Sequence, residues 1–294
     1  MKAGNGRRPN SAPCIDVIAL HSNVKRVCLV IAIALAAAGL TEAADPIRVI
    51  ILTGNSDYSH PWRPTVPFLR ETLENTGRFD VRVEEEVRGI TSATLAPYDV
   101  LVDYYYGPRL GDVTEKAIEE FVRGGKGMVA IHGTDYGPFF GQAGGNPQEP
   151  KRRMEGEPWL AFEEMVGMDW KIENIGHTRR HVYPVQWTDK EHPIAKGLPP
   201  VFLANDELHH RIDLKPNAHV IATAYDDPAI PGGGGGTGKD EPVIWTVPFG
   251  QGRVVMTVLG HDLLAMTQPG FIQAFTRAVE WTATGDVKPP DRAH

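Results

Sequence analysis

Cysteine is almost absent from this sequence. The chain has 294 residues and two cysteines, Cys14 and Cys28, both of which precede residue 44. The remaining residues therefore provide no thiol nucleophile, no disulfide and no cysteine-ligated zinc. Because no such cross-link is available, a domain formed by the remaining roughly 250 residues must be stabilised by its hydrophobic core.

Several other patterns are missing, and each absence argues against a class of function. The net charge of −7 and the lack of a basic stripe argue against nucleic-acid binding. No Gly-x-Ser-x-Gly motif indicates a serine hydrolase, and no His-Glu-x-x-His motif indicates a zinc peptidase. The glycines after the first predicted strand do not form a phosphate-binding pattern, so nucleotide binding is not expected.

The N-terminus has the pattern of an export signal. Lys25 and Arg26 precede an apolar run from Val27 to Leu40, and small residues follow it. The run is too short to span a bilayer comfortably, so we interpret residues 1–43 as an N-terminal extension and signal peptide, cleaved after Ala43. We therefore expect an exported protein, periplasmic or extracellular, with no stable membrane span in its mature form. Retention of the leader as an anchor is the alternative.

The next part of the chain alternates between apolar strands and amphipathic helices. Its strands are rich in Val, Ile and Leu, as expected where both faces of a sheet are covered. This alternation is typical of an α/β fold with a mostly parallel sheet and helices on both faces. We expect one domain at residues 44–285 and a polar tail at 286–294. The expected elements are strands at 47–52, 79–84, 98–104 and 127–131 and helices at 65–77 and 112–123.

The later part of the chain is richer in turns. Residues 182–187 and 219–225 are expected to be strands, and a last helix is expected to include residues 272–281. Residues 242–248 and 253–259 alternate around a glycine-containing turn, which indicates a hairpin.

Histidines recur just after the predicted strands. His60 follows the first strand, and His132 and Asp135 follow the fourth. The last strand ends at His261 and Asp262. One histidine in such a place is about as often a buried core residue as a functional one. The carboxyl ends of parallel strands meet at one edge of a sheet, however, so at least the first two groups should converge in a shared site.

These residue types allow three chemical uses. Histidines and carboxylates can transfer protons near neutral pH, ligate a metal, or hydrogen-bond a polyhydroxylated ligand on which Trp62 or a tyrosine packs. A second titratable group lies at residues 206–210. The spacing of His177 and His181 would put two ligands on one face of a helix, but Gly176 makes a helix doubtful. We therefore assign no metal ligand, and the sequence identifies no cofactor.

Short motifs follow one another in order over residues 47–283. They are Leu52-Thr53-Gly54, His60-Pro61-Trp62, Tyr98-Asp99-Val100, Ile131-His132-Gly133, His192-Pro193-Ile194, Asp206-Glu207-Leu208, Glu241-Pro242-Val243-Ile244-Trp245 and Leu259-Gly260-His261-Asp262. In number and order they resemble the ThuA-like family, the trehalose-utilisation type of domain.

This resemblance implies a three-layer flavodoxin-like fold, similar to that of class I glutamine amidotransferases. Those enzymes use a cysteine at the turn between a strand and a helix, where this chain has His132 and Gly133. Amidotransferase activity should therefore be absent. The family also implies a role in carbohydrate utilisation, on disaccharides or their oxidised derivatives. The chain departs from the family pattern in its leader, in its glycine tract at 232–236, and in His209, where tyrosine is common.

Our hypothesis is an exported enzyme, a hydrolase, lyase or isomerase, that acts on a disaccharide or an oxidised (keto) sugar derivative. His132, His261 and a carboxylate would supply acid–base catalysis. The carboxylate would come from Glu207 or Asp262. The residues expected to position the small-molecule sugar are His60, Trp62, Asp135, His177 and His210. The alternatives are a non-catalytic saccharide-binding module and a metal-dependent hydrolase, and the sequence is compatible with a homo-oligomer.

Overall fold

A computed structural model describes residue 1 and residues 45–55, 60–135, 137–141, 158–170, 175–232 and 235–288. The chain divides after Asp45 into two compact units. The predicted leader and its cleavage site at Ala43 lie outside the described residues, as do residues 289–294 of the predicted tail. The fold and the site below belong to the unit that begins at Pro46.

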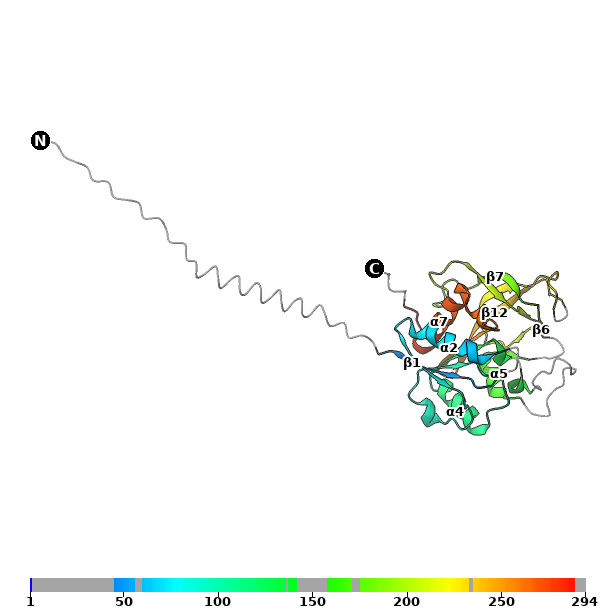
Figure 1. Cartoon of the computed structure of the whole chain (residues 1–294), viewed down its shortest axis with the longest axis horizontal. Coiled ribbons are helices and arrows are strands. Elements are labelled where there is room, and N and C mark those ends of the chain that lie inside the picture. The colour runs from blue at the N-terminus through cyan, green and yellow to red at the C-terminus, as the bar shows by residue number, and fades with distance from the viewer. Residues whose placement is uncertain are drawn as a thin grey trace. The chain divides into compact units, whose positions relative to one another are not determined.

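In the described part of the chain, nine strands form one mixed sheet in the order β2-β1-β3-β4-β13-β12-β11-β7-β8. Figure 1 labels β1, β7 and β12 among them. Neighbours from β2 to β13 are parallel, and those from β13 to β8 are antiparallel. The strands are β1 (Ile47–Leu52), β2 (Phe79–Glu84), β3 (Val100–Asp103), β4 (Gly127–Ile131), β7 (His181–Trp187), β8 (Val201–Asp206), β11 (His219–Tyr225), β12 (Asp240–Phe249) and β13 (Gly252–Thr257). The expected mostly parallel sheet is therefore correct for one half only, because the predicted hairpin of β12 and β13 reverses the strand direction.

Two pairs of two-residue strands lie outside the main sheet. β5 (Met168–Asp169) pairs with β10 (Asp213–Leu214), and β6 (Gly176–His177) pairs with β9 (His209–His210). The second pair brings two histidine-containing segments into contact that are far apart in the sequence.

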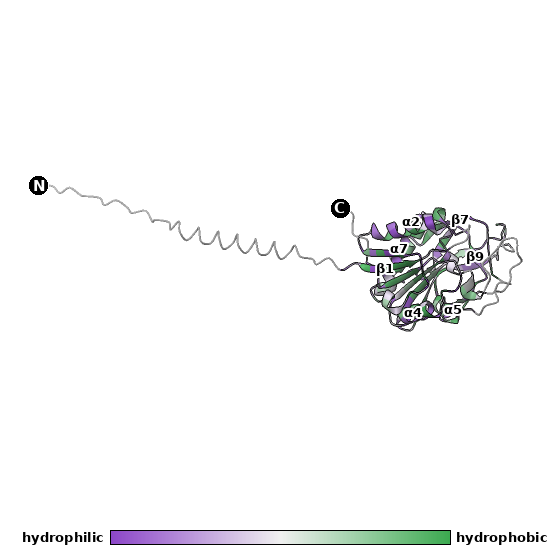
Figure 2. Cartoon of the chain, turned by 60° about the horizontal axis from the view of Figure 1, so that its bottom comes forward, coloured by the Kyte–Doolittle hydropathy of each residue, from purple (hydrophilic) through white to green (hydrophobic). Residues whose placement is uncertain are grey.

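Helices cover both faces of the sheet. Figure 2 shows α2 (Trp62–Glu74) and α7 (Pro269–Thr284) on one side and α4 (Asp112–Arg123) and α5 (Leu160–Val166) on the other. The short α6 (Leu263–Met266) packs against α2 and α7, and α3 (Ser92–Leu95) packs against α4. Two 3₁₀ turns follow β4, η1 (His132–Asp135) and η2 (Pro138–Phe140). None of the helices in the described residues is long and apolar enough to cross a membrane.

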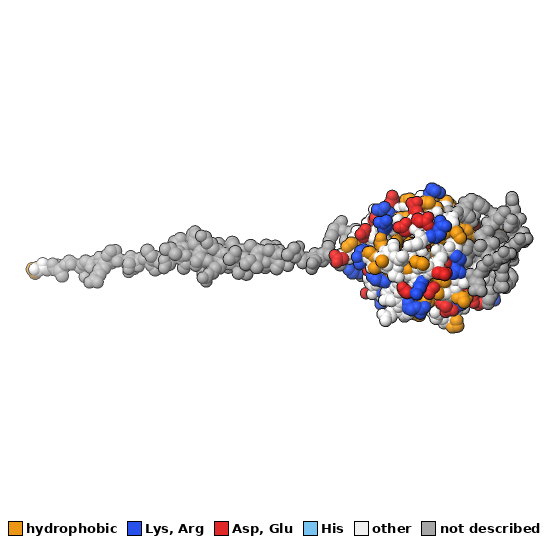
Figure 3. Space-filling model, turned by 90° about the horizontal axis from the view of Figure 1, so that it is seen from below, with side chains coloured by type: hydrophobic (Ala, Val, Ile, Leu, Met, Phe, Trp, Pro, Cys, Tyr) orange, Lys and Arg blue, Asp and Glu red, His pale blue; other side chains and the backbone are white. Residues whose placement is uncertain are grey.

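The central strands form the core, as their apolar runs predict. All four residues of β3 and all five of β4 are buried, and Trp245 of β12 is wholly enclosed. The Trp245 indole donates a hydrogen bond to the Val166 carbonyl at 2.7 Å, which satisfies its polar atom inside the core. The outer surface is polar, and Figure 3 shows basic and acidic side chains interspersed over one face.

Helix α2 begins three residues earlier than expected. The sequence predicted a start at residue 65, but the N-cap is Pro61, and Trp62 is the first helical residue. The Thr65 hydroxyl donates to the Pro61 and Trp62 carbonyls at 2.8 and 3.2 Å, so it lies within the first turn. Trp62 is thereby part of the helix, and it packs partly against the core rather than standing in a loop.

Candidate functional site

Three predicted site histidines meet at one edge of the sheet. His60 follows β1, His132 follows β4, and His261 follows β13, and these strands run parallel. The ring centroids are 5.3 Å apart for His60 and His132, 4.9 Å for His60 and His261, and 5.1 Å for His132 and His261. The convergence follows from the shared direction of the strands.

His132 has the most constrained position of the three. Its φ of 40° is left-handed, a region that few non-glycine residues occupy and that is concentrated at functional sites. Its side chain is buried, and its Nδ1 donates to the Val258 carbonyl at 2.5 Å. Burial lowers the pKa of His132 well below its usual value, and the neighbouring imidazoles lower it further. His132 is therefore a neutral imidazole whose Nε2 carries a lone pair.

That lone pair points at His261. The two nitrogens, His132 Nε2 and His261 Nδ1, are 3.1 Å apart, so His261 can donate to His132. His261 is held there through Gly260, whose backbone N–H donates to Asp206 at 2.7 Å. Gly260 has a φ of 110°, and a Cβ at this position would lie 2.8 Å from the Ile131 side chain. The turn that brings His261 against the end of β4 therefore requires glycine.

His209 joins the cluster, although the sequence hypothesis selected its neighbour. Its ring centroid is 4.6 Å from that of His132 and 5.7 Å from that of His177. His210, by contrast, turns to the other side of β9, where its Nδ1 lies 2.8 Å from Asp226. Successive strand residues face opposite ways, but both sides of β9 are buried. Both histidines are therefore buried, on opposite sides of the strand.

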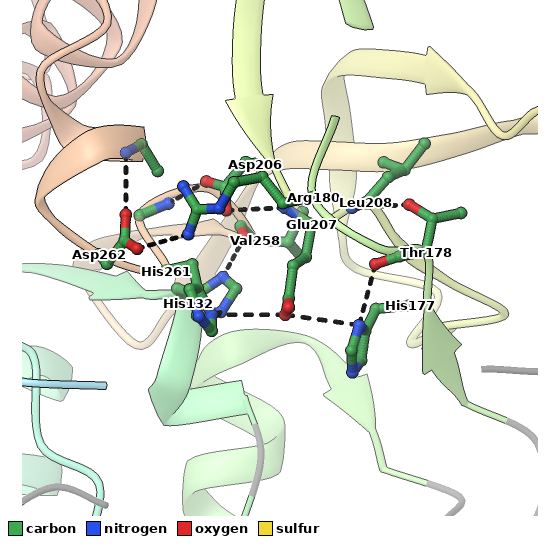
Figure 4. Close-up of polar contacts among 12 residues, drawn as sticks. His132, His177, Thr178, Arg180, Asp206, Glu207, Leu208, Val258, His261 and Asp262 are labelled. Carbon is green, nitrogen blue, oxygen red and sulfur yellow. Dashed lines mark hydrogen bonds and ion pairs between the residues drawn. The ribbon is translucent and has the colours of Figure 1, made fainter. Parts of the chain in front are cut away.

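Glu207 is the carboxylate that reaches the imidazoles. Its Oε2 lies 3.4 Å from the Nδ1 of His261 and 3.4 Å from the Nδ1 of His177 (Figure 4). Its side chain keeps 20% of its surface exposed, so it can meet a ligand from solvent. His177 is itself half-exposed, and partial burial lowers its pKa.

Asp262, the other carboxylate that the sequence offered, is engaged elsewhere. It caps α6 by accepting the Ala265 N–H at 3.1 Å, and it forms an ion pair with Arg180 at 2.5 Å (Figure 4). Both interactions draw its oxygens away from the histidines, so its place in the structure is that of a helix cap.

Asp206 connects the strands that carry the site. One oxygen accepts the Glu207 N–H at 2.8 Å and the other accepts the Gly260 N–H, which joins the end of β8 to the turn before His261. Burial raises the pKa of Asp206 to about 7. The sequence places Asp206 in the titratable group at residues 206–210 but does not reveal this role, because the bond to Gly260 spans 54 positions and leaves no local signal.

A small recess opens beside His60. Its lining residues come from the segments after β1, β3 and β4, and it encloses about 180 Å³, open solvent included. They are Asn55, His60, Tyr104, Tyr105, Tyr106, Gly133 and Thr134. β1 lies between β2 and β3 in the sheet, and the chain runs from β1 to β2 on one side before it continues to β3 on the other. Ligands in open α/β sheets bind where the strand order reverses in this way. The recess therefore has the position of a ligand pocket.

The last two residues predicted to position the sugar are Trp62 and Asp135. Trp62 is partly buried, and the Arg63 guanidinium lies 4.6 Å from its ring centroid. It does not line the recess. Asp135 ends η1, and its side chain lies outside the described part of the chain.

Among the residues that the structure describes, two overlapping sets of side chains could hold a metal ion. They are His60, His132 and His261, and His132, Glu207 and His209; within each set the ligand atoms lie within 4.8 Å of one another. His132 belongs to both sets. The sequence assigned no ligand because these residues come from separate strands and have no characteristic spacing.

Comparisons with known proteins agree with this architecture. The family model ThuA, described as trehalose utilisation, matches residues 48–282. A ThuA-like protein from Parabacteroides merdae is 29% identical with a TM-score of 0.65, and the match covers 83% of this chain and 92% of that one. One from Bacteroides uniformis is 15% identical with a TM-score of 0.64, over 85% and 98%. No curated protein sequence matches the chain. The chain belongs to the ThuA family.

Proposed function

We propose that this protein is an exported enzyme that transfers protons on a disaccharide or an oxidised (keto) sugar derivative. One observation carries the proposal: the Glu207 carboxylate lies between two imidazoles, 3.4 Å from each, at the sheet edge where ligands of α/β folds bind. A carboxylate and neutral imidazoles in reach of one another can take up and return a proton near neutral pH. The trehalose-utilisation family supports a sugar as substrate.

The geometry narrows the roles that the sequence suggested. Glu207 exchanges the proton with the sugar, because it combines contact with the imidazoles and access to solvent. His261 supports it from 3.4 Å, and His132 orients His261 through its Nε2. Asp262 stabilises α6 and does not take part.

The recess supplies the binding surface in this proposal. Tyrosine rings pack well against the apolar faces of a sugar, and side-chain amides and hydroxyls bind its hydroxyl groups. Tyr106 lies with its ring centroid 5.1 Å from that of His60, so a sugar in the recess would reach the histidine cluster through His60. Asn55 and Thr134 are polar residues of the same lining.

We further propose that the fold is a three-layer flavodoxin-like one. The order of the five parallel strands, β2-β1-β3-β4-β13, supports this, since it repeats the flavodoxin strand order of 2-1-3-4-5. Helices on both sheet faces support it too. The position after β4 carries His132, and no cysteine follows residue 28, so the chain has no thiol for amidotransferase chemistry.

Export is part of the proposal and rests on the leader alone. The basic pair at residues 25–26, the apolar run and the small residues near Ala43 support cleavage there. N-terminal sequencing of the protein secreted by a bacterial host tests it. A mature protein that begins at Ala44 is expected, whereas an intact leader in the membrane fraction would show that it is retained as an anchor.

The activity is tested with the purified mature protein and a panel of disaccharides and their keto derivatives, followed by proton NMR in D₂O. Product formation or exchange of a carbon-bound proton is expected, and Glu207→Gln should abolish both. His219→Ala, which alters an exposed histidine on β11, is the matched control. Saccharide binding by calorimetry without product or exchange would overturn the enzyme proposal in favour of a binding module.

A further inference from the structure

The three histidines at the sheet edge bring their ligand atoms within 4.8 Å of one another, close enough to share a single ion. Imidazole nitrogens bind zinc at about 2.0–2.1 Å, so two of them on one ion are separated by about 2.9–3.4 Å. The separation between His132 Nε2 and His261 Nδ1 is 3.1 Å. His60 brings a third ligand atom to within 4.8 Å of both.

The surroundings of His132 add a second, independent observation. A histidine that binds a metal usually donates its other ring N–H to a carboxylate or a backbone carbonyl, which fixes the ring and its tautomer. His132 donates its Nδ1 proton to the Val258 carbonyl at 2.5 Å. The bond leaves the lone pair of His132 on Nε2, which faces His261 at 3.1 Å.

A plain hydrogen bond explains less of the geometry. If His261 donates to His132, the 3.1 Å contact between those two rings is accounted for. That bond does not involve His60, which comes from a third strand end to the same point, with its ring 5.3 Å and 4.9 Å from the other two. A common ion accounts for all three approaches at once.

We propose that His60, His132 and His261 bind a divalent cation of the kind that prefers imidazole, such as zinc. Three histidine ligands leave one position open for a substrate oxygen. His60 also lines the recess, so the open position would be accessible from it. The role of the ion on a sugar rests on the proposed function: the cation would polarise a carbonyl or hydroxyl oxygen, and Glu207, 3.4 Å from His261, would exchange the proton.

Metal binding is measured first, without any sugar. The full-length protein is stripped with a chelator and titrated with Zn²⁺ by calorimetry, and bound metal is counted by mass spectrometry. One ion per chain is expected. His60→Ala and His261→Ala should each weaken binding by more than the ~10–100-fold that loss of an outer partner costs, and His219→Ala should bind as the unmodified protein does.

Two variants separate the proposed ligand set from the overlapping one. His132 is shared by both sets and is wholly buried, so its replacement is not used. Glu207→Gln and His209→Ala should keep the ion. Absence of zinc binding, or unchanged binding in His60→Ala, overturns the proposal, as does loss of the ion in Glu207→Gln and His209→Ala. Circular dichroism confirms that each variant is folded.

The same protein distinguishes this inference from the proposed function. Bound zinc without turnover of any sugar would refute the enzyme and keep the cation site. Full turnover in the stripped protein, with no zinc taken up, would refute the cation site and keep the enzyme. An ion whose removal abolishes turnover agrees with both.

Discussion

The two adjacent histidines of β9, His209 and His210, lie in different environments. His210 is wholly buried and faces a carboxylate, Asp226, which is also wholly buried and accepts the Thr237 N–H at 2.6 Å. His209 is nearly as buried, but the rings that face it belong to His132 and His177. One histidine has its own carboxylate, and the other is placed among imidazoles.

The pair of His210 and Asp226 has the environment of a group that stabilises the fold, whereas the cluster around Glu207 is where we propose chemistry. A buried imidazole with a carboxylate partner is satisfied, and the pair ties β9 to the segment after β11. A group of imidazoles around one partly exposed carboxylate gains little stability, and such arrangements are typical of functional sites. Backbone strain does not separate the two: among the described residues the non-glycine positive φ angles are 40° at His132 and 59° at Arg211, one beside each group.

The largest effect should come from the carboxylate of the histidine cluster. Glu207→Gln keeps the size of the side chain but removes its ability to take up a proton, so turnover should fall by about 10²–10⁴-fold. NMR assays of sugar conversion measure it. Unfolding in urea should show little change, and a variant with full turnover would show that Glu207 is not the proton-transfer group.

The carboxylate-paired histidine should instead affect stability. The structure gives the Asp226 carboxylate two hydrogen bonds, from His210 and from the Thr237 N–H. His210→Ala removes the first and leaves the buried carboxylate with the second. Loss of one partner of a buried pair costs about 3–5 kcal/mol of unfolding free energy.

His209→Ala is the matched control for that variant, since it is the adjacent residue on the same strand. Compared with His210→Ala, His209→Ala should lower the free energy of unfolding less and reduce turnover more. Urea unfolding and activity, measured on both variants, would break the comparison if the two histidines behaved alike.

A third buried group, Asp103, can be compared with the pair of His210 and Asp226, because its carboxyl group accepts a backbone N–H where Asp226 faces a histidine. Burial raises the pKa of Asp103 from 3.8 to about 7, and the Tyr105 N–H, 3.2 Å from its Oδ1, offsets this only in part. Since the folded state holds this proton more tightly than the unfolded one, the contribution of Asp103 to stability is complete below pH 4. It is lost as the pH rises through 7.

Asp103→Asn should therefore be the more stable protein at pH 8, by on the order of 2–4 kcal/mol relative to its difference at pH 4. The asparagine oxygen can still accept the Tyr105 N–H. Urea unfolding of both proteins at pH 4, 6 and 8 measures the trend. A difference that stays constant with pH would contradict a raised pKa at this position.

The smallest effect is expected at Asp262, the carboxylate that caps α6. Asp262→Ala should lower the free energy of unfolding by about 1 kcal/mol. Asp262→Asn keeps the helix cap and loses only the ion pair with Arg180, so it should lower this free energy less. Turnover should stay within about threefold in both, less than the smallest usual effect of removing a proton-transfer group. A loss of turnover as large as that of Glu207→Gln would show that Asp262 takes part in proton transfer.

Much of the site could be predicted from the sequence, because parallel strands carry their carboxyl ends to one edge. Apolar runs located β1 and β4, and the convergence of His60 and His132 followed from their positions after these strands. His261 could be included because the hairpin indicated where β13 ends. These inferences need only local patterns and one geometric rule.

The rest depended on contacts between distant segments. The pairing of β6 with β9 decides that His209 faces the cluster and His210 faces Asp226, and two-residue strands have no periodicity to reveal it. The antiparallel half of the sheet was likewise hidden, because strand direction beyond a hairpin is set by packing. Nothing local indicates the ion pair of Arg180, because its partner Asp262 lies 82 residues away.

We propose that the edge around Glu207 and the recess beside His60 form one sugar site. The most direct measurement is a crystal structure of Glu207→Gln with a keto-disaccharide that the unmodified enzyme converts. The account predicts sugar density in the recess, with a sugar atom within hydrogen-bond distance of residue 207. A sugar bound at another surface, with the recess and the histidine cluster unchanged, would contradict it.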